Sequence, residues 1–122
     1  MARSTRSPDD FLPMKPTPYL ILLALAEGSR HGYALMKEID RLTDHKVRLN
    51  PGPLYRALDS CVELGLIEIA DERPEPVLDD ERRVYYRLTR VGRSVLGAET
   101  DRLGRLVAGA RRLGVAGREG TR

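Results

Sequence analysis

The amino-acid sequence predicts a mainly α-helical fold with one small β-hairpin. Apolar residues recur at helical spacing in four segments, and two short stretches, 66–71 and 83–89, have the composition of strands. The 122 residues are enough for one domain with a hydrophobic core and too few for two ordinary domains.

The two ends of the chain differ from its middle. Residues 1–16 and 114–122 are polar, and the first of these segments combines prolines and serines with mixed charges. We expect a flexible N-terminal arm over 1–16 and a flexible tail over 114–122. The folded part is then a domain over 17–89 followed by a C-terminal helix over 90–113.

The first two helices have recognisable ends. Thr17 and Pro18 are a typical cap and first residue of a helix, which continues through "YLILLALAEG" to a stop at Gly28. A second helix is predicted from about His31 to Thr43, and a very short strand follows at 47–49.

The third helix follows the rigid segment "NPGP" at 50–53, because proline is well tolerated in the first turn of a helix. Its apolar arc includes Leu54, Leu58 and Cys61, and Gly65 closes it. Its opposite side carries Tyr55, Arg56, Asp59, Ser60 and Glu63.

The hairpin joins residues 66–71 to "RVYYRLT" at 83–89 through a long polar tip. Alternation predicts that Val84, Tyr86 and Leu88 face the core, and that Arg83, Tyr85 and Arg87 face outward. Thr89 can cap the last helix, which we expect from about Arg90 to Leu113.

The first and last helices both indicate a partner chain. The first is apolar on nearly every side, whereas a surface helix has a single apolar stripe. Four glycines in the last helix each cost roughly 1 kcal/mol relative to alanine, so this helix needs something to pack on. We therefore expect a homodimer whose interface includes Leu20, Leu23, Leu96, Leu103, Leu106, Ala110 and Leu113.

The predicted order of elements is helix, helix, short strand, helix, strand, long tip, strand and helix. This order is typical of a winged helix-turn-helix, whose third helix enters the major groove of DNA with its N-terminal residues first. The helix dipole favours phosphate near Pro53 and Tyr55. Arg56 can reach a guanine edge or a phosphate, and the Tyr55 hydroxyl can donate a hydrogen bond. Asp59 and Glu63 would repel the backbone, so only the first turn and a half should touch DNA.

The distribution of charge agrees with this orientation. The formal net charge is +3, and residues 28–56 alone hold six basic against three acidic side chains. A basic balance permits nucleic-acid binding without demonstrating it, since a solvated basic face has the same composition.

Three segments resemble the PadR family of transcriptional regulators: "YLILLALAEGSRHGYALMKEID" at 19–40, "LNPGPLYRALDSCVELGLIE" at 49–68 and "RRVYYRLTRVGRSVL" at 82–96. The fragments "HGY", "PGPLYRAL", "GLI" and "YYRLT", in this order, are specific in combination. A single C-terminal helix is similar to the short-tailed subfamily.

This resemblance implies a dimeric repressor that binds double-stranded DNA at an inverted-repeat operator and is often released by a small-molecule effector. The family's DNA-facing positions fall on Tyr33, Lys37, Asn50, Pro51, Gly52, Leu54, Tyr55 and Arg56, and its wing positions on Arg82 and Arg83.

Two features depart from the family pattern. The wing tip, residues 71–83, holds six acidic against three basic side chains, so either it swings away and only Arg82 and Arg83 engage DNA, or it contacts another partner. Glu99 interrupts the apolar arc of the last helix, and we expect an interface ion pair with an arginine of the other subunit in preference to a contact with a cationic ligand. Without tryptophan, the chain cannot stack aromatic ligands on that residue as some short-tailed relatives do.

Several classes of protein are disfavoured. We expect no metal, no cofactor and no enzyme activity, because the two histidines stand apart and no nucleophile–base set or phosphate loop is present. The single Cys61 is expected to be a small core residue. No apolar run is long enough for a membrane span, and the start of the sequence lacks a signal-peptide core, so we expect a cytoplasmic protein.

One alternative function stays open. A winged helix can also serve as a protein-interaction module, and the acidic wing would then be its partner surface. A ligand-sensing module with a secondary role for DNA would need a sizeable apolar cavity between subunits.

Overall fold

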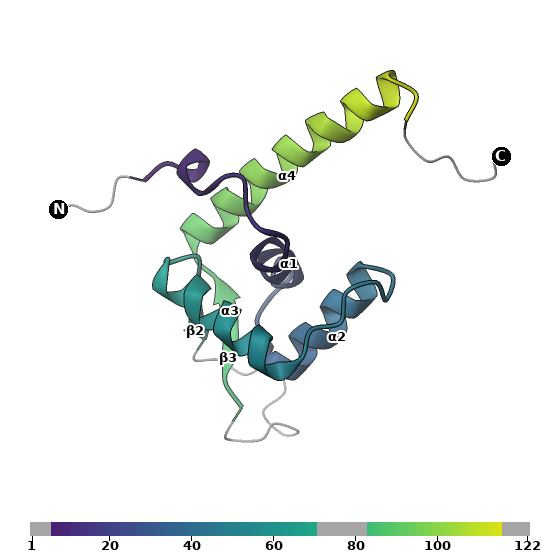
Figure 1. Ribbon diagram of the computed structural model, residues 1–122. Helices are drawn as coiled ribbons and strands as arrows, with labels where there is room; N and C mark the ends of the chain where they lie inside the picture. Colours follow the sequence, from purple (N-terminus) through teal and green to yellow (C-terminus); the bar gives the residue numbers. More distant parts are fainter. Residues whose placement is uncertain (1–5, 71–82, 116–122) are drawn as a thin grey trace.

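The computed structural model describes residues 6–70 and 83–115 (Figure 1). Within them the chain forms a 3-10 helix, four α-helices and three strands. In chain order these are η1 (Pro8–Phe11), α1 (Pro16–Ala24), β1 (Arg30–His31), α2 (Gly32–Leu42), α3 (Pro51–Glu63), β2 (Ile67–Ala70), β3 (Tyr85–Leu88) and α4 (Arg90–Arg112). The mainly α fold with a small hairpin, predicted from the sequence, is confirmed. The wing tip and Arg82 lie outside the described residues.

The sheet has three antiparallel strands in the order β1-β3-β2. The predicted hairpin is present, with Ile67 opposite Leu88 and Ala70 opposite Tyr85. The third strand is not at 47–49, which is irregular, but at 30–31, where Arg30 pairs with Tyr86. At the expected position, the backbone N–H of Val47 instead donates to the hydroxyl of Thr43.

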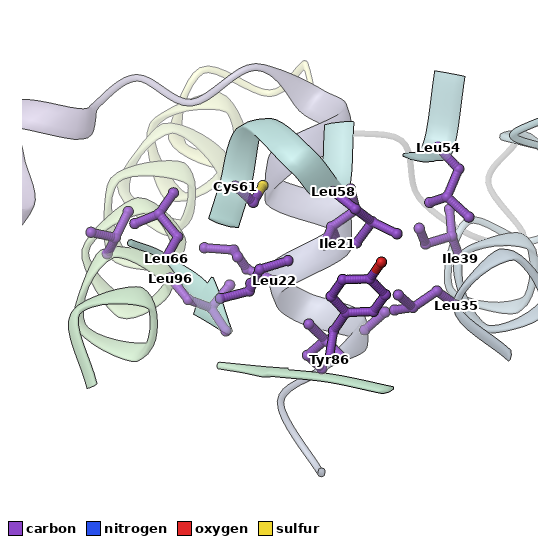
Figure 2. Close-up of a cluster of buried hydrophobic side chains, with 14 residues drawn as sticks. Ile21, Leu22, Leu35, Ile39, Leu54, Leu58, Cys61, Leu66, Tyr86 and Leu96 are labelled. Atoms are coloured by element: carbon purple, nitrogen blue, oxygen red, sulfur yellow. The ribbon is translucent and has the colours of Figure 1, made fainter. Parts of the chain in front are cut away.

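The core surrounds α1, which lies centrally and contacts α2, α3 and α4 (Figures 1 and 2). Ile21 and Leu22 are fully buried, whereas Leu20 and Leu23 are half-buried against the same cluster. The helix begins at Pro16, two residues earlier than expected, and ends at Ala24, four residues before Gly28. Its apolar character is thus mostly satisfied within one chain.

The N-terminal segment packs against the folded body over residues 8–14, where we expected a flexible arm. Ser7 and Asp10 form a reciprocal capping box at the start of η1, and η1 contacts α4. Phe11, Leu12 and Met14 are partly buried against the core. Burial of these apolar side chains holds the segment against the core. The prolines, serines and charges on which we based the expected arm do not indicate this packing.

The side chains of β3 and of the residue before it do not alternate strictly between the core and solvent. Tyr86 is buried as predicted, but Tyr85 is buried too, and Val84 is exposed. Tyr85 is covered because β1 brings the ring of His31 edge-on to it, with ring centroids 5.1 Å apart. The prediction of an outward Tyr85 was wrong because it assumed a two-stranded hairpin with one open face.

The start of α4 is fixed by Thr89, as predicted. Its hydroxyl accepts a hydrogen bond from Gly92 N–H at 2.9 Å and donates to the Gly65 carbonyl at 2.6 Å. Its own N–H donates to the Leu66 carbonyl at 3.1 Å. A Cβ on Gly92 would lie 2.8 Å from the Leu66 carbonyl carbon and nearer still to its oxygen. The helix therefore packs against this backbone at a distance that only glycine allows.

Candidate nucleic-acid interface

The start of α3 is formed by Asn50, which has an extended backbone and makes no side-chain cap, followed by Pro51 and Pro53 within the first turn. Prolines carry no N–H, and Leu54 N–H already donates to the Asn50 carbonyl at 3.0 Å. Among the described contacts, only the amide of Gly52 stays unpaired in this turn. The affinity of this helix end for an anion therefore depends mainly on side chains, and less on backbone N–H groups than we expected from the sequence.

Those side chains are accessible. Tyr55 is 43% exposed and Arg56 is exposed, as predicted, with Asp59, Ser60 and Glu63 further along the same surface. The guanidinium of Arg56 makes no ion pair or hydrogen bond with any described residue, so it is available to a ligand. Leu54, by contrast, is 0% exposed in the core and has no surface for DNA.

The start of α2 lies beside the start of α3, in the lower part of Figure 1. His31 caps α2 by accepting a hydrogen bond from Ala34 N–H at Nδ1, at 3.2 Å. The exposed Tyr33 ring stacks on His31, and Lys37 places its Nζ 5.3 Å from the centroid of the Tyr33 ring. Arg83 reaches His31, with Nη1 3.0 Å from Nε2.

A depression of about 300 Å³ marks the place where these elements meet. It is lined by residues from β1, from the start of α2, from α3, and from β3 with the two residues before it: His31, Gly32, Tyr33, Tyr55, Arg83, Val84 and Tyr86. The structure thus brings three of the predicted site residues, Tyr33, Tyr55 and Arg83, around one depression, and Lys37 lies beside Tyr33 outside its lining. His31 and Gly32 were not in the predicted contact set, although both belong to the fragment "HGY" that carries part of the resemblance.

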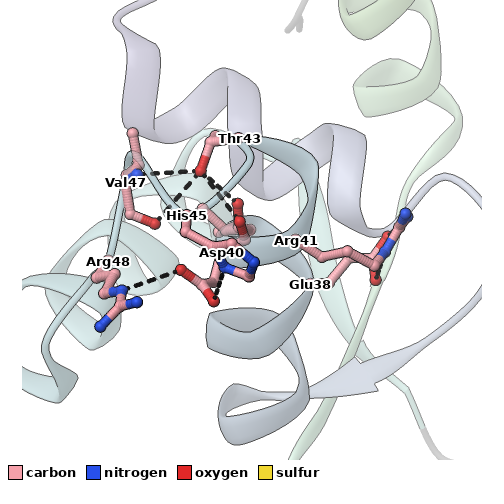
Figure 3. A network of polar contacts seen from close by, with 8 residues as sticks. Glu38, Asp40, Arg41, Thr43, His45, Val47 and Arg48 are labelled. Atoms are coloured by element: carbon pink, nitrogen blue, oxygen red, sulfur yellow. Dashed lines mark hydrogen bonds and ion pairs between the residues drawn. The ribbon is translucent and has the colours of Figure 1, made fainter.

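A polar network fixes the connection between α2 and α3 (Figure 3). Asp40 binds His45 at 2.8 Å and Arg48 at 3.2 Å, while the Thr43 hydroxyl donates to the Ile39 carbonyl and accepts from Val47 N–H. The hydrogen bond from His45, followed by the charges of His45 and Arg48, holds the pKa of the Asp40 carboxyl below its ordinary value. This network holds residues 43–48, which lead from α2 toward the start of α3.

The predicted interface residues fall into two groups. Leu96 is buried in the core of its own chain, and Leu20, Leu23, Leu103 and Ala110 are half-buried. Leu106 and Leu113 are exposed, at 59% and 80%. Among the predicted interface residues, the strongly exposed ones thus lie in and just after the C-terminal half of α4, which extends beyond the rest of the fold in Figure 1.

Glu99 has a partner within its own chain, where we expected an arginine of a second subunit. Its carboxylate is 2% exposed and accepts two hydrogen bonds from Arg102, at 2.7 Å each, and one from Met14 N–H at 3.3 Å. Arg102 lies one turn further along α4, a spacing that favours such pairs. The charge of Glu99 is thereby neutralised, which leaves none for a cationic ligand.

The Glu99 contacts predict a dependence of stability on pH. The hydrogen bond from Arg102 lowers the pKa of Glu99 below its ordinary value of 4.5, with a further contribution from Met14 N–H. Because the pKa of Glu99 is lower in the folded than in the unfolded protein, the ionised carboxylate stabilises the fold. This contribution to the free energy of unfolding is complete above about pH 4.5 and is lost as the pH falls through the folded-state pKa. We expect the gap in unfolding free energy between wild type and Glu99→Gln to shrink between about pH 7 and pH 3. Urea unfolding of both proteins at each pH measures it, and a constant gap would contradict the assignment.

Cys61 is buried on the core side of α3, and burial raises the pKa of its thiol to about 11. It is therefore a small apolar residue in this fold, with little thiolate at neutral pH. Over residues 6–70 and 83–115, no cluster of His, Cys, Asp and Glu has the make-up of a metal site.

Residues 21–98 match the sequence profile described as the transcriptional regulator PadR-like family. The chain belongs to this family. The PadR-like family consists of DNA-binding transcriptional regulators and not of enzymes, which agrees with the function class predicted from the sequence.

Solved structures share the PadR-like fold. A transcriptional regulator from Clostridium thermocellum superposes with a TM-score of 0.64 at 23% identity, covering 88% of this chain and 97% of that one. A PadR family regulator from Clostridium difficile R20291 gives a TM-score of 0.67 at 22% identity, over 81% and 98%. RosR from H. salinarum gives 0.59 at 28% identity, over 81% and 79%.

A sequence relative is longer than this chain. An uncharacterized 37.1 kDa protein in a transposon of Streptomyces fradiae is 36% identical over 87 residues, which are 71% of this chain. The chain spans 23% of that relative's length.

Among the described helices, none has the length and apolar character that crossing a membrane requires.

Proposed function

We propose that this PadR-like regulator is a dimeric repressor that reads an inverted-repeat operator with the tip of α3. One observation carries the proposal: the unpaired, exposed Arg56 projects from the first turns of α3, next to the exposed Tyr55. A guanidinium at this place can donate two hydrogen bonds to a guanine edge in the major groove, or can bind a phosphate.

The residues around this tip would hold the DNA backbone. The Tyr55 and Tyr33 hydroxyls are donors on exposed rings, and Lys37 and Arg83 supply positive charge beside them. Phosphate contacts of this kind position a protein on DNA without reading its sequence. We propose Tyr33, Lys37, Asn50, Pro51, Gly52, Tyr55, Arg56 and Arg83 as the contact set, with Arg82 added from the sequence.

The C-terminal half of α4 supports a homodimer. Leu106 and Val107 are exposed there and Leu113 is exposed directly after it, and burying them against the same residues of a second copy would remove apolar surface from water. Two α3 tips about one turn of DNA apart would then match an inverted repeat.

The dimer leads to a prediction. Leu106→Asp should convert the dimer to a monomer, because a charge at a two-fold interface meets its own copy. Sedimentation velocity measures the mass, and circular dichroism checks that the fold is kept, since Leu106 is exposed within one chain. A monomeric wild type, or a variant that stays dimeric, would argue against this surface.

An effector site would lie beside that interface. A depression of about 350 Å³ is formed by the N-terminal segment, α1 and α4, with Met14, Pro16, Tyr19, Leu20, Glu99, Arg102 and Leu103 around it. Since Glu99 and Arg102 neutralise each other, an uncharged apolar molecule fits this lining best. We propose the cytoplasm of a prokaryotic cell as the compartment, since an operator would lie there.

The function is tested by selecting fragments of the organism's genomic DNA on the purified protein and sequencing what is retained. We expect enrichment of a few fragments that share an inverted repeat. Retention of no fragment above background would reject the proposal, and uniform retention of all fragments would reject sequence-specific binding.

A further inference from the structure

Gly32, the first residue of α2, lies directly against the ring of Tyr55 in α3. A Cβ atom on Gly32 would stand 2.6 Å from Cζ of Tyr55 and 3.1 Å from its Cε1, and nearer still to the hydroxyl oxygen. Gly32 is buried, although Tyr55 is half exposed. The phenol therefore covers the start of α2 and occupies the space that a side chain on Gly32 would need.

The backbone does not explain glycine at this position. Positive φ values among the described glycines occur at Gly28, Gly65 and Gly114, and Gly32 is not one of them. Alanine can therefore adopt the conformation of Gly32, and within helices alanine is ordinarily favoured over glycine. The requirement for glycine at residue 32 comes from the space that the Tyr55 ring occupies.

We infer that Gly32 is a positioning residue, which seats Tyr55 across the start of α2 and so holds its hydroxyl at the DNA-binding end of the molecule. This inference rests on the proposed function and adds a coupling between two helices to it. The partner chemistry is the DNA phosphate backbone, which the hydroxyl of a seated Tyr55 can reach together with Tyr33 and Arg83.

Displacement of the Tyr55 ring would remove its hydroxyl from the proposed contact with DNA phosphate. Tyr86, nine-tenths buried, and Val84 form other parts of the same depression. A methyl group at residue 32 would force the Tyr55 ring out of its place, either into this depression or into solvent. In both cases the hydroxyl would leave the position that it now holds against Gly32.

A double-mutant cycle between Gly32→Ala and Tyr55→Ala tests the inference. The probe is a labelled duplex taken from the genomic fragments that the wild type retains, and fluorescence anisotropy measures its affinity. We expect each single variant to lose a similar factor, on the order of 3- to 10-fold, as for one neutral hydrogen bond. In the Tyr55→Ala background, Gly32→Ala should cause no further loss.

Stability provides a second, DNA-independent readout. Gly32→Ala should lower the midpoint of urea unfolding in the wild-type background but not in the Tyr55→Ala background, where the methyl group has room. Gly97→Ala is the matched control, since its Cβ would meet nothing within 4 Å and it lies on α4, outside the proposed contacts. It should leave the duplex affinity unchanged.

Two results would overturn the inference: unchanged duplex affinity in Gly32→Ala, or an equal loss on adding Gly32→Ala to Tyr55→Ala. If the wild type bound no duplex, the proposed function would fail, and with it the role of Gly32 in DNA binding. The urea midpoints would still test the contact between Gly32 and Tyr55. If the shift in the double variant equalled the sum of the shifts in the two single variants, the contact would be refuted.

Discussion

Gly92→Ala is expected to destabilise the protein by roughly 3 kcal/mol, the largest effect of exchanging any of the described glycines for alanine. The added methyl group would collide with the Leu66 carbonyl, which already accepts the Thr89 N–H. A flexible side chain can turn away from such a collision, but a backbone carbonyl between α3 and β2 cannot. Either α4 moves off the hairpin, or the Thr89 cap is broken.

Urea unfolding at a fixed protein concentration measures this loss, because the stability of a dimer depends on concentration. Gly97→Ala, five residues along the same helix and open to solvent, serves as the control and should stabilise by about 1 kcal/mol. Equal effects of the two substitutions would show that helix propensity alone matters and that the contact with Leu66 does not.

Arg56→Ala is expected to weaken duplex binding by about 10- to 100-fold, the range for one specific arginine contact to a base. The fold should be unaffected, because the Arg56 side chain is exposed and has no partner among the described residues. Tyr55→Phe removes only a hydroxyl and should cost a smaller factor, about 3-fold. Anisotropy with a genomic duplex gives both values.

Arg90→Ala is the matched control for Arg56→Ala. Arg90 is an exposed arginine at the start of α4, at the opposite end of β3 from Arg83, so its loss removes the same charge elsewhere. Its effect should be at most a few-fold. If Arg56→Ala and Tyr55→Phe both kept the wild-type affinity, the proposed face of α3 would be wrong.

The helices were largely predictable from the sequence, because local signals determine them. Pro51 and Pro53 mark the first turn of α3, and the Thr89 hydroxyl caps α4 as the sequence indicates. The same was true of the hairpin strands, which are rich in β-forming residues. These features need no knowledge of what the element packs against.

The errors arose where distant segments meet. A two-residue strand at Arg30 and His31 has no alternation to detect, yet it exists because β3 offers a free edge. The burial of Tyr85 follows from that missed strand. The packing of Phe11 and Met14, and the pairing of Glu99 with Arg102, depend on tertiary contacts that periodicity does not reveal.

The candidate site was predictable in part. The resemblance to PadR regulators marked Tyr33, Tyr55 and Arg83, which lie around one depression, but it also marked Leu54, which is buried. Residue type and spacing cannot tell an exposed position from a buried one at the edge of an apolar arc. The role that we propose for Gly32 depends on a contact between two helices, which only coordinates show.

The central claim, that the tip of α3 binds a polyanion, is tested most directly by the salt dependence of wild-type binding to a genomic duplex. Binding that releases counterions from phosphates gives a logarithm of affinity that falls linearly with the logarithm of salt concentration. We expect a steep negative slope between about 50 and 200 mM salt. A slope near zero, or no binding at the lower salt concentration, would contradict the claim.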